Sequence, residues 1–316
     1  MIDIPTVFIL GAGASKPYGL PTSIELTSYA ATHILDRNSI DVRNARLKDL
    51  GAPPPEDFIE MAQHLQSIRT MSIDEWVARN PKYFESGRIA IAYVISRQEG
   101  QDRSIAKNQD WLADLWVNYL STDCLKIQDL KNNEVSFITF NYDRSLEHYL
   151  YQLISHTYSR ASAEEVLKVA NDFKIIHVHG QVGYLTWQTS DGAAPKKEFK
   201  ASNSWEEAVR VSKQVKIISE LEPKTSEYLQ ARKALAQSGR ICFLGFGYHN
   251  ENLRRLRPIT KDETVKSKLV IGSAYELEDR EFGILQSGTS PIGYPIQLDL
   301  GKTNCADFLK REMPRN

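Results

Sequence analysis

The feature that most constrains this fold is a set of five short apolar runs, each of which stops abruptly at glycine or a polar residue. Compact apolar runs of this kind are typical of strands buried on both faces of a parallel sheet. Long stretches of helical periodicity separate the runs and leave room for the crossovers that parallel strands require. The predicted strands span residues 6–10, 135–140, 174–178, 240–244 and 268–271. The sequence therefore predicts an α/β protein with a Rossmann-like parallel sheet and helices on both faces.

The gap between the first two predicted strands, residues 22–133, is far too long for one crossover helix. We therefore expect a single domain over residues 1–316 that carries a large helical insertion lobe at 22–133, since 316 residues exceed the usual size of one simple domain. Helical patterns in this lobe cover residues 23–35, 55–68, 81–97 and 110–119. A polar, turn-rich stretch and two later helices are expected at 181–204, 205–221 and 224–237.

The composition excludes several classes of protein. Lys and Arg total 39 and Asp and Glu total 40, so no long-range field attracts nucleic acid or anionic lipid, although a local basic patch is compatible with this balance. No apolar stretch approaches the roughly 18–20 residues of a membrane span. Three isolated cysteines, Cys124, Cys242 and Cys305, form neither a disulfide framework nor a metal-binding pair. We expect a cytoplasmic protein without a bound metal.

Glycine or polar residues follow every predicted strand. In an open parallel sheet, ligands bind beyond the carboxyl ends of the strands, so these residues are the first candidates for a site. They are Gly11-Ala12-Gly13, Asn141-Tyr142-Asp143, His179-Gly180, Gly245-Phe246-Gly247 and Gly272-Ser273.

The first of these turns has the composition of a phosphate-binding loop. Gly11 and Gly13 would let the backbone approach a pyrophosphate, and Ser15 would offer a hydroxyl near the start of a helix. Lys16 stands where dinucleotide-dependent dehydrogenases have a third glycine, and no acidic residue ends a second strand about twenty residues on. Hydride transfer is therefore disfavoured. A Gly-Ala-Gly sequence in isolation is more typical of a tight turn.

The second and third strands end in side chains suited to ribose chemistry. Asn141 offers an uncharged amide that can bind a ribose hydroxyl or a water. His179, at the lip of its strand, is a candidate general base, whereas His177, two residues deeper, is expected to be a second-layer or core histidine. Asp143 is either an N-cap of the next helix or, as the less favoured alternative, a ligand contact.

The fourth and fifth strands end in two further candidate turns. Gly245 and Gly247 predict a second close approach of backbone to ligand, with a helix-capping loop through Asn250 or Glu251 as the alternative. Ser273 is a candidate contact for the adenosine end of a dinucleotide.

In order and spacing, these motifs together resemble the sirtuin family. The ordered set is Gly-Ala-Gly-Ala-Ser at 11–15 with Gly-Leu-Pro-Thr at 19–22, Thr-Phe-Asn-Tyr-Asp at 139–143, His-Gly at 179–180 and Gly-Phe-Gly at 245–247. The chain is more closely similar to the sirtuin-like domain of bacterial anti-phage effectors, in which Ser-Ile-Asp-Glu-Trp at 72–76 also has a counterpart. The resemblance extends from residue 7 to about 275.

The resemblance implies NAD⁺ as substrate, with its pyrophosphate on residues 11–15 and its nicotinamide ribose near Asn141 and His179, which become the catalytic candidates. The expected NAD⁺-binding residues are Gly11, Ala12, Gly13, Ser15, Thr22, Asp143, Gly245, Gly247 and Ser273.

The departures from the family narrow the expected reaction. Sirtuin deacylases carry a four-cysteine zinc module after the catalytic histidine, and this chain has no cysteine between Cys124 and Cys242. Thr22-Ser23-Ile24 also replaces their Asp-Phe-Arg turn. We therefore expect an NAD⁺ hydrolase of anti-phage defence that forms nicotinamide and ADP-ribose or its cyclic form. A non-catalytic NAD⁺ or ADP-ribose sensor is the alternative from another class, and an NAD-dependent deacylase is the less favoured one.

Unrestrained hydrolysis of NAD⁺ would poison the cell that makes the enzyme. We therefore expect activity to be gated by homo-oligomer formation or by a separately encoded partner, such as a translocase-type ATPase, by analogy with related defence systems. The helical insertion at 22–133 is the candidate assembly surface.

Overall fold

A computed structural model describes residues 1–36, 45–68, 70–101, 105–106, 108–190, 192, 194–217, 225–257, 268–275, 277, 283, 285, 297–298 and 302–314. Its centre is a six-stranded sheet in which every neighbouring pair of strands is parallel. The strands are β1 (Thr6–Leu10), β2 (Val135–Thr139), β3 (Lys174–His177), β6 (Arg240–Leu244), β7 (Leu269–Gly272) and β8 (Gln297–Leu298). All five predicted strands are present, with ends shifted by no more than one residue.

The strand order is β3-β2-β1-β6-β7-β8. Counted along the chain within this sheet, it is 3-2-1-4-5-6, the order of doubly wound dinucleotide-binding folds. The predicted Rossmann-like fold class is therefore confirmed. The sequence did not predict β8, because two residues are too few for a periodic pattern to emerge.

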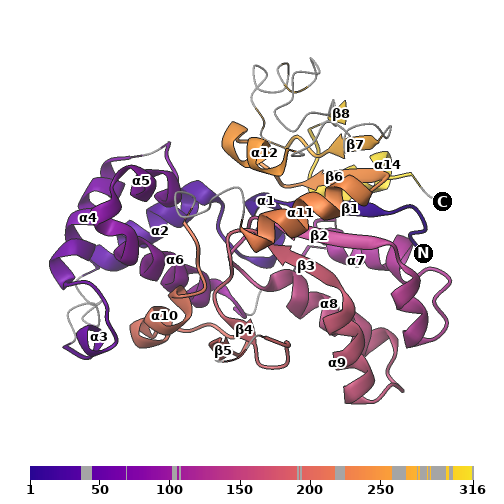
Figure 1. The fold of residues 1–316 in the computed structure, drawn as a ribbon, viewed down its shortest axis with the longest axis horizontal. Coiled ribbons are helices and arrows are strands. Elements are labelled where there is room, and N and C mark those ends of the chain that lie inside the picture. Colours follow the sequence, from indigo (N-terminus) through magenta and orange to yellow (C-terminus); the bar gives the residue numbers. More distant parts are fainter. Residues whose placement is uncertain are drawn as a thin grey trace.

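Successive residues of β1 bury opposite faces of the sheet, as the two-residue period of a strand requires. Val7 and Ile9 join the apolar cluster of α11 (Ser226–Gln237) and α12 (Asn250–Leu256), whereas Phe8 and Leu10 join the cluster that covers the other face. The helices of that second face are α7 (Trp111–Leu115), α8 (Ser145–Thr157) and α14 (Cys305–Glu312). Helices therefore cover both faces (Figure 1).

Most of the residues between β1 and β2 form a separate helical lobe beyond the carboxyl end of β1 (Figure 1). Trp205, which comes much later in the chain, also belongs to this lobe, because its ring stacks on Tyr93 with centroids 3.8 Å apart. The lobe consists of α2 (Ser23–Leu35), α3 (Ala45–Asp49), α4 (Pro55–Ser67), α5 (Ile73–Arg79), α6 (Phe84–Gln98) and α10 (Trp205–Ser212).

The C-terminal part of the 22–133 segment lies on the sheet and not in the lobe. Helix α7 and the π-helical turn after it (Trp116–Leu120) pack on the sheet, and the Trp116 indole donates a hydrogen bond to Thr157 of α8 (2.9 Å). The segment thus contributes both to the lobe and to a layer of the core. The predicted helix at 81–97 begins with a 3-10 turn, Pro81–Tyr83, and continues as α6. The remaining elements are α1 (Ala12–Ser15), η1 (Lys16–Tyr18), η5 (Ile127–Asn132), α9 (Ala163–Asp172), β4 (Tyr184–Leu185) and β5 (Lys196–Lys197).

A buried ion pair joins the lobe to the sheet. Arg144, just before α8, and Glu99, just after α6, are both fully buried and hydrogen-bonded to each other. The guanidinium also donates to the carbonyls of Tyr184 (3.2 Å), Lys197 (2.9 Å) and Glu198 (3.2 Å). Because removal of one member of such a pair leaves an uncompensated buried charge, this contact fixes the lobe against the rim of the sheet.

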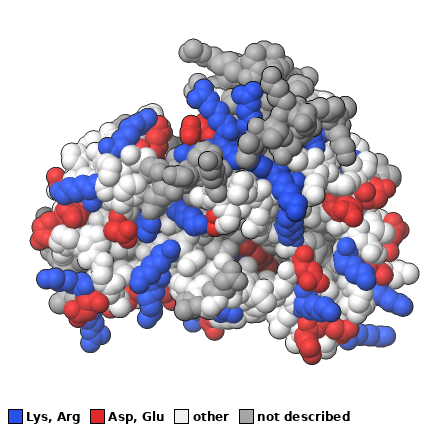
Figure 2. Space-filling model, viewed as in Figure 1, with Lys and Arg blue, Asp and Glu red and all other residues white. Residues whose placement is uncertain are grey.

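The surface bears charges of both signs. Figure 2 shows acidic and basic side chains interspersed over one face, with Lys and Arg gathered over α11 and α12. Among the helices that the structure describes, none has the length and apolar character needed to cross a membrane.

Candidate functional site

The candidate residues meet where the strand order reverses, between β1 and its neighbours. Leu10, the last residue of β1, pairs with Thr139 of β2 and with Leu244 of β6. The three strands therefore end level, and the turns that follow them lie side by side. This reversal point is where doubly wound sheets bind their ligands.

The two glycine turns at this point are packed directly against each other. A Cβ atom on Gly11 would lie 2.5 Å from the carbonyl oxygen of Gly245, and one on Gly13 would lie 2.9 Å from the Gly245 Cα. Gly245 itself has φ +56°, and a Cβ there would lie 2.0 Å from the Ala14 nitrogen. The glycines are therefore required by contact between the turns, whether or not a ligand binds.

The backbone amides of the first turn are largely occupied. Those of Gly11, Gly13 and Ala14 donate to the carbonyls of Leu244 (3.1 Å), Gly245 (3.0 Å) and Gly11 (2.9 Å). The Ser15 hydroxyl is also occupied, because it accepts from Asn141 and donates to Asp143. An anion at this turn would therefore depend on Ala12, where α1 begins.

Asn141 ties the turn after β2 to the first glycine turn. Its Nδ2 donates to the Gly11 carbonyl and to the Ser15 hydroxyl, both at 2.9 Å, and its backbone amide donates to Thr139 (3.0 Å). These bonds use both amide hydrogens and fix the orientation of the side chain. The Oδ1 atom accepts no hydrogen bond from the residues that the structure describes. Asn141 thus presents one acceptor at the reversal point of the sheet.

Asp143 lies two residues after Asn141, just before α8. Its carboxylate accepts a hydrogen bond from the Ser145 amide (3.0 Å) in the first turn of α8, and the side chain is 5% exposed. Burial raises the pKa of this carboxyl, while hydrogen bonds from Ser145 and Ser15 oppose the rise. Arg144, and not Asp143, is the N-cap of α8, so Asp143 supports the start of the helix from one position earlier than expected.

His177 forms a second layer under Asn141. Its Nε2 lies 2.6 Å from the Glu147 carboxylate, and its Nδ1 lies 3.1 Å from the Asn141 carbonyl oxygen. Burial alone would lower the pKa of His177, but the neighbouring Glu147 charge raises it, and the pKa of Glu147 is lowered in return. The His177–Glu147 pair thus supports the backbone of Asn141 through the contact of His177 with the Asn141 carbonyl oxygen.

His179 is buried among aromatic rings and is only 4% exposed. Its Nε2 lies 3.3 Å from the Tyr228 hydroxyl, and its ring packs edge-on against Phe140 with centroids 5.1 Å apart. Burial, and to a smaller extent the positive charge of Arg255, lower the pKa of His179 to about 3. The imidazole is therefore neutral at physiological pH. Its Nδ1 makes no hydrogen bond to any residue in the described part of the chain.

The glycine after His179 has a structural explanation. Gly180 has φ +70°, and a Cβ there would lie 1.8 Å from the Gln214 carbonyl oxygen, because residues 214–216 cross the end of β3. The Lys216 amide donates to the His179 carbonyl (2.9 Å). This crossing segment holds the backbone of His179 in place.

Two of the remaining predicted contact residues, Thr22 and Ser273, have structural roles, and the third, Gly247, has none among the residues that the structure describes. Thr22 and Glu25 form a capping box at the start of α2. The Ser273 hydroxyl accepts a hydrogen bond from the Gly245 amide (2.9 Å) and so supports the second glycine turn. Gly247 is exposed, and a Cβ there would meet only the His249 ring, at 3.1 Å.

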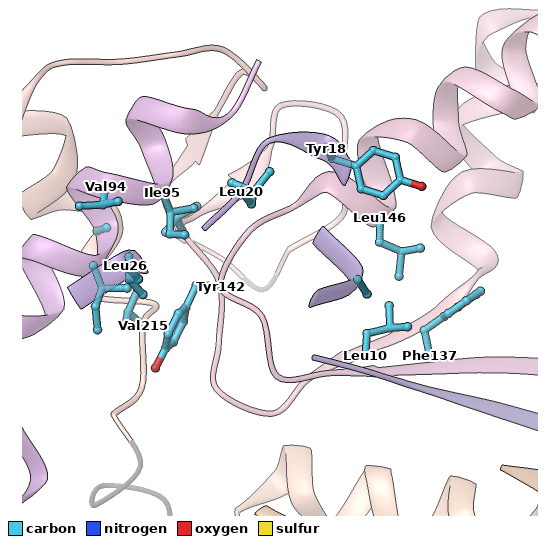
Figure 3. Packing of buried hydrophobic residues seen from close by; sticks show 14 of the residues in the cluster. Leu10, Tyr18, Leu20, Leu26, Val94, Ile95, Phe137, Tyr142, Leu146 and Val215 are labelled. Carbon is cyan, nitrogen blue, oxygen red and sulfur yellow. The ribbon is translucent and has the colours of Figure 1, made fainter. Parts of the chain in front are cut away.

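Sequence reasoning did not assign a role to Asp74. This residue of α5 is 7% exposed, and its carboxylate accepts a hydrogen bond from the Tyr142 hydroxyl. Burial raises the pKa of Asp74 to about 6. Figure 3 shows Tyr142 beside Val215 and Ile95, extended toward the lobe. The sequence signal that could have pointed to Asp74 is the motif at 72–76, but the sequence does not show that this motif contacts Tyr142.

In the described part of the chain, no group of three or more His, Cys, Asp or Glu side chains is arranged to hold a metal ion. The three cysteines are buried and free, and burial raises the pKa of Cys305 to about 12. Comparisons with models of known protein families and with curated proteins find no match to this chain.

Proposed function

We propose that this chain binds NAD⁺ at the reversal point of the sheet and hydrolyses its nicotinamide–ribose bond. The observation that carries the proposal is the position of Asn141, whose amide hydrogens bind Gly11 and Ser15 while its Oδ1 remains available. A neutral acceptor at the dinucleotide position of a 3-2-1-4-5-6 sheet suits a ribose that becomes positively charged as nicotinamide leaves.

The proposed reaction consumes one water molecule. The bond between the ribose C1′ and the nicotinamide nitrogen breaks, and its electron pair leaves with nicotinamide. Water forms the new bond at C1′ and loses one proton, which gives ADP-ribose. Asn141 orients the ribose or the water through Oδ1. In the tautomer whose Nε2–H donates to the Tyr228 hydroxyl, His179 accepts a hydrogen bond or the proton at Nδ1.

The state of His179 bears on this mechanism. A general base works best when its pKa lies near the working pH, and the pKa of His179 is about 3. The ring is thus neutral at the working pH but is a weak base, which suits orientation of a hydroxyl or water better than complete proton transfer. The same low basicity favours the second candidate, a non-catalytic module that binds NAD⁺ or ADP-ribose and signals to a partner.

The proposed hydrolase is an effector that depletes cellular NAD⁺ and is held inactive until an oligomer or partner protein forms around it. The helical lobe supports this part of the proposal, because it lies beyond the strand ends and is joined to them by the Arg144–Glu99 pair. Any partner that moves the lobe would disturb the rim of the sheet.

The test is to incubate the purified chain with NAD⁺, alone and with candidate partners, and to separate the products by chromatography. We expect release of nicotinamide and ADP-ribose, and a loss of roughly 10²–10³-fold in rate for His179→Ala, as for removal of a preorganised polar group. Intact NAD⁺ together with measurable binding by calorimetry would support the sensor. Absence of binding would contradict both functions.

A further inference from the structure

The contact between Asp74 and Tyr142 joins the helical lobe to both candidate catalytic residues. Asp74 lies on α5 of the lobe, 67 positions before Asn141 in the sequence. Tyr142 follows Asn141 directly, and its ring centroid lies 6.1 Å from that of His179. One hydrogen bond from the lobe thus reaches Tyr142, which is next to Asn141 in the sequence and close to His179 in space.

Tyr142 is held on both sides. Its carbonyl accepts a hydrogen bond from the Val182 amide (2.9 Å), just beyond His179 in the chain. Its hydroxyl donates to Asp74 and lies 3.4 Å from the Lys216 carbonyl oxygen, while the Lys216 amide donates to His179. A shift of the Tyr142 ring would therefore move both the turn at 141–143 and the segment that holds His179.

The burial of Asp74 gives this contact its strength. A buried carboxylate is unfavourable unless it is hydrogen-bonded. The buried Asp74 carboxylate therefore favours the orientation in which the Tyr142 hydroxyl donates to it. Glu75, the next residue, is 48% exposed and pairs with Arg79 of the same helix. The two adjacent acids of α5 thus differ in environment, and Glu75 offers a matched control.

We propose that Asp74 is a positioning residue, which acts through the Tyr142 hydroxyl to set the turn at 141–143 against His179 and so makes the helical lobe a necessary part of the site. This inference rests on the proposed function for its catalytic consequence, whereas its structural part is independent of any reaction. Movement of α5 by a partner would then change the site without any contact between the partner and NAD⁺.

The experiment compares the full-length parent with Asp74→Leu, Asp74→Asn, Tyr142→Phe and Glu75→Gln. Hydrogen–deuterium exchange of peptides that cover residues 139–147 and 177–183 reports on the position of the turn. Loss of one buried hydrogen bond should raise exchange there roughly five- to tenfold in Asp74→Leu and Tyr142→Phe. Asp74→Asn keeps an acceptor and should restore protection, and Glu75→Gln should match the parent.

Kinetics supply the second measurement. Misplacement of catalytic groups by about 1 Å lowers rates by up to roughly a hundredfold, so kcat for nicotinamide release should fall ten- to a hundredfold in Asp74→Leu, with little change in KM. Unchanged exchange in both Asp74→Leu and Tyr142→Phe would overturn the inference. If Asp74→Leu fails to fold, Tyr142→Phe decides. If the parent releases no nicotinamide, the proposed function fails, and the exchange data still decide the role of Asp74.

Discussion

The two halves of the site rim use their residues in different ways. On the side of β1 and β6, Gly11, Gly13 and Gly245 pack backbone on backbone, and their amides donate within the protein. On the side of β2 and β3, Asn141 and His179 are buried and oriented by several partners, and the Asn141 Oδ1 and the His179 Nδ1 make no hydrogen bond to the described residues. The glycines thus fix the packing of the two turns, whereas the Asn141 amide and the His179 imidazole are the groups to which the proposed function assigns chemistry.

The largest expected effect is on the glycine side. Gly245→Ala places a Cβ 2.0 Å from the Ala14 nitrogen at φ +56°, so we expect a loss of more than about 4 kcal/mol in the free energy of unfolding, among the largest effects of single substitutions. Thermal unfolding of Gly245→Ala and Gly247→Ala measures the difference. Equal midpoints in the two variants would contradict the packing argument, because Gly247 is exposed and meets only the His249 ring.

The next largest effect is expected for Asn141, just beyond the end of β2, where the rate of reaction should fall much more than the stability. Asn141→Ala removes the bonds to Gly11 and Ser15 together with the available Oδ1, so nicotinamide release should fall by about 10²–10³-fold, as for loss of a preorganised polar group. The free energy of unfolding should fall by only about 1–3 kcal/mol. Asn118→Ala, which removes a bond to Asp114 on a helix of the core, is the control and should keep the parental rate. A parental rate for Asn141→Ala would remove the amide from the mechanism.

A smaller effect tests the burial of His179 through pH. Its pKa falls from the ordinary 6.5 to about 3 in the folded protein, so the stability it contributes is present above pH 6.5 and is lost as the pH falls toward 3. His179→Gln should abolish this loss. The unfolding free energy of the parent relative to that variant should therefore drop by roughly 2 kcal/mol between pH 7.5 and 4.5. Denaturant unfolding at the two pH values measures it, and a constant difference would mean that the imidazole is solvated.

The smallest effect concerns Thr22. Because its hydroxyl accepts a hydrogen bond from the Glu25 amide, Thr22→Ala should destabilise the protein by about 1 kcal/mol, the usual effect of losing an N-cap. We expect the KM for NAD⁺ to stay at the parental value. A rise in KM without loss of stability would instead make Thr22 a substrate contact.

Much of the sheet was predictable because burial on both faces leaves a strong local pattern. The runs at 6–10 and 240–244 match β1 and β6 in both bounds. The small sheet of β4 and β5 was not predicted, since two-residue strands in a polar stretch leave no periodicity. The helix expected at 205–221 ends at Ser212 as α10, and the residues 218–224 lie outside the described part of the chain.

The candidate site also has a part that the sequence predicts and a part that it does not. Asn141 and His179 could be proposed from their places at strand ends, because parallel strands bring their carboxyl ends to one edge. The pKa of His179, the pairing of His177 with Glu147 and the contact of Asp74 with Tyr142 depend on neighbours 30 or more positions away in the sequence. A local sequence pattern cannot predict contacts between residues that lie so far apart in the sequence.

By itself, the sequence determined the parallel sheet, the large helical insertion and the set of turns at the rim, because each follows from apolar periodicity and from residue types at strand ends. Only the tertiary structure decided what those turns do. It showed that Gly11 and Gly245 are needed by each other, that the Asn141 amide hydrogens are already used, and that a lobe helix reaches Tyr142. Packing and hydrogen bonding between distant segments decide these points.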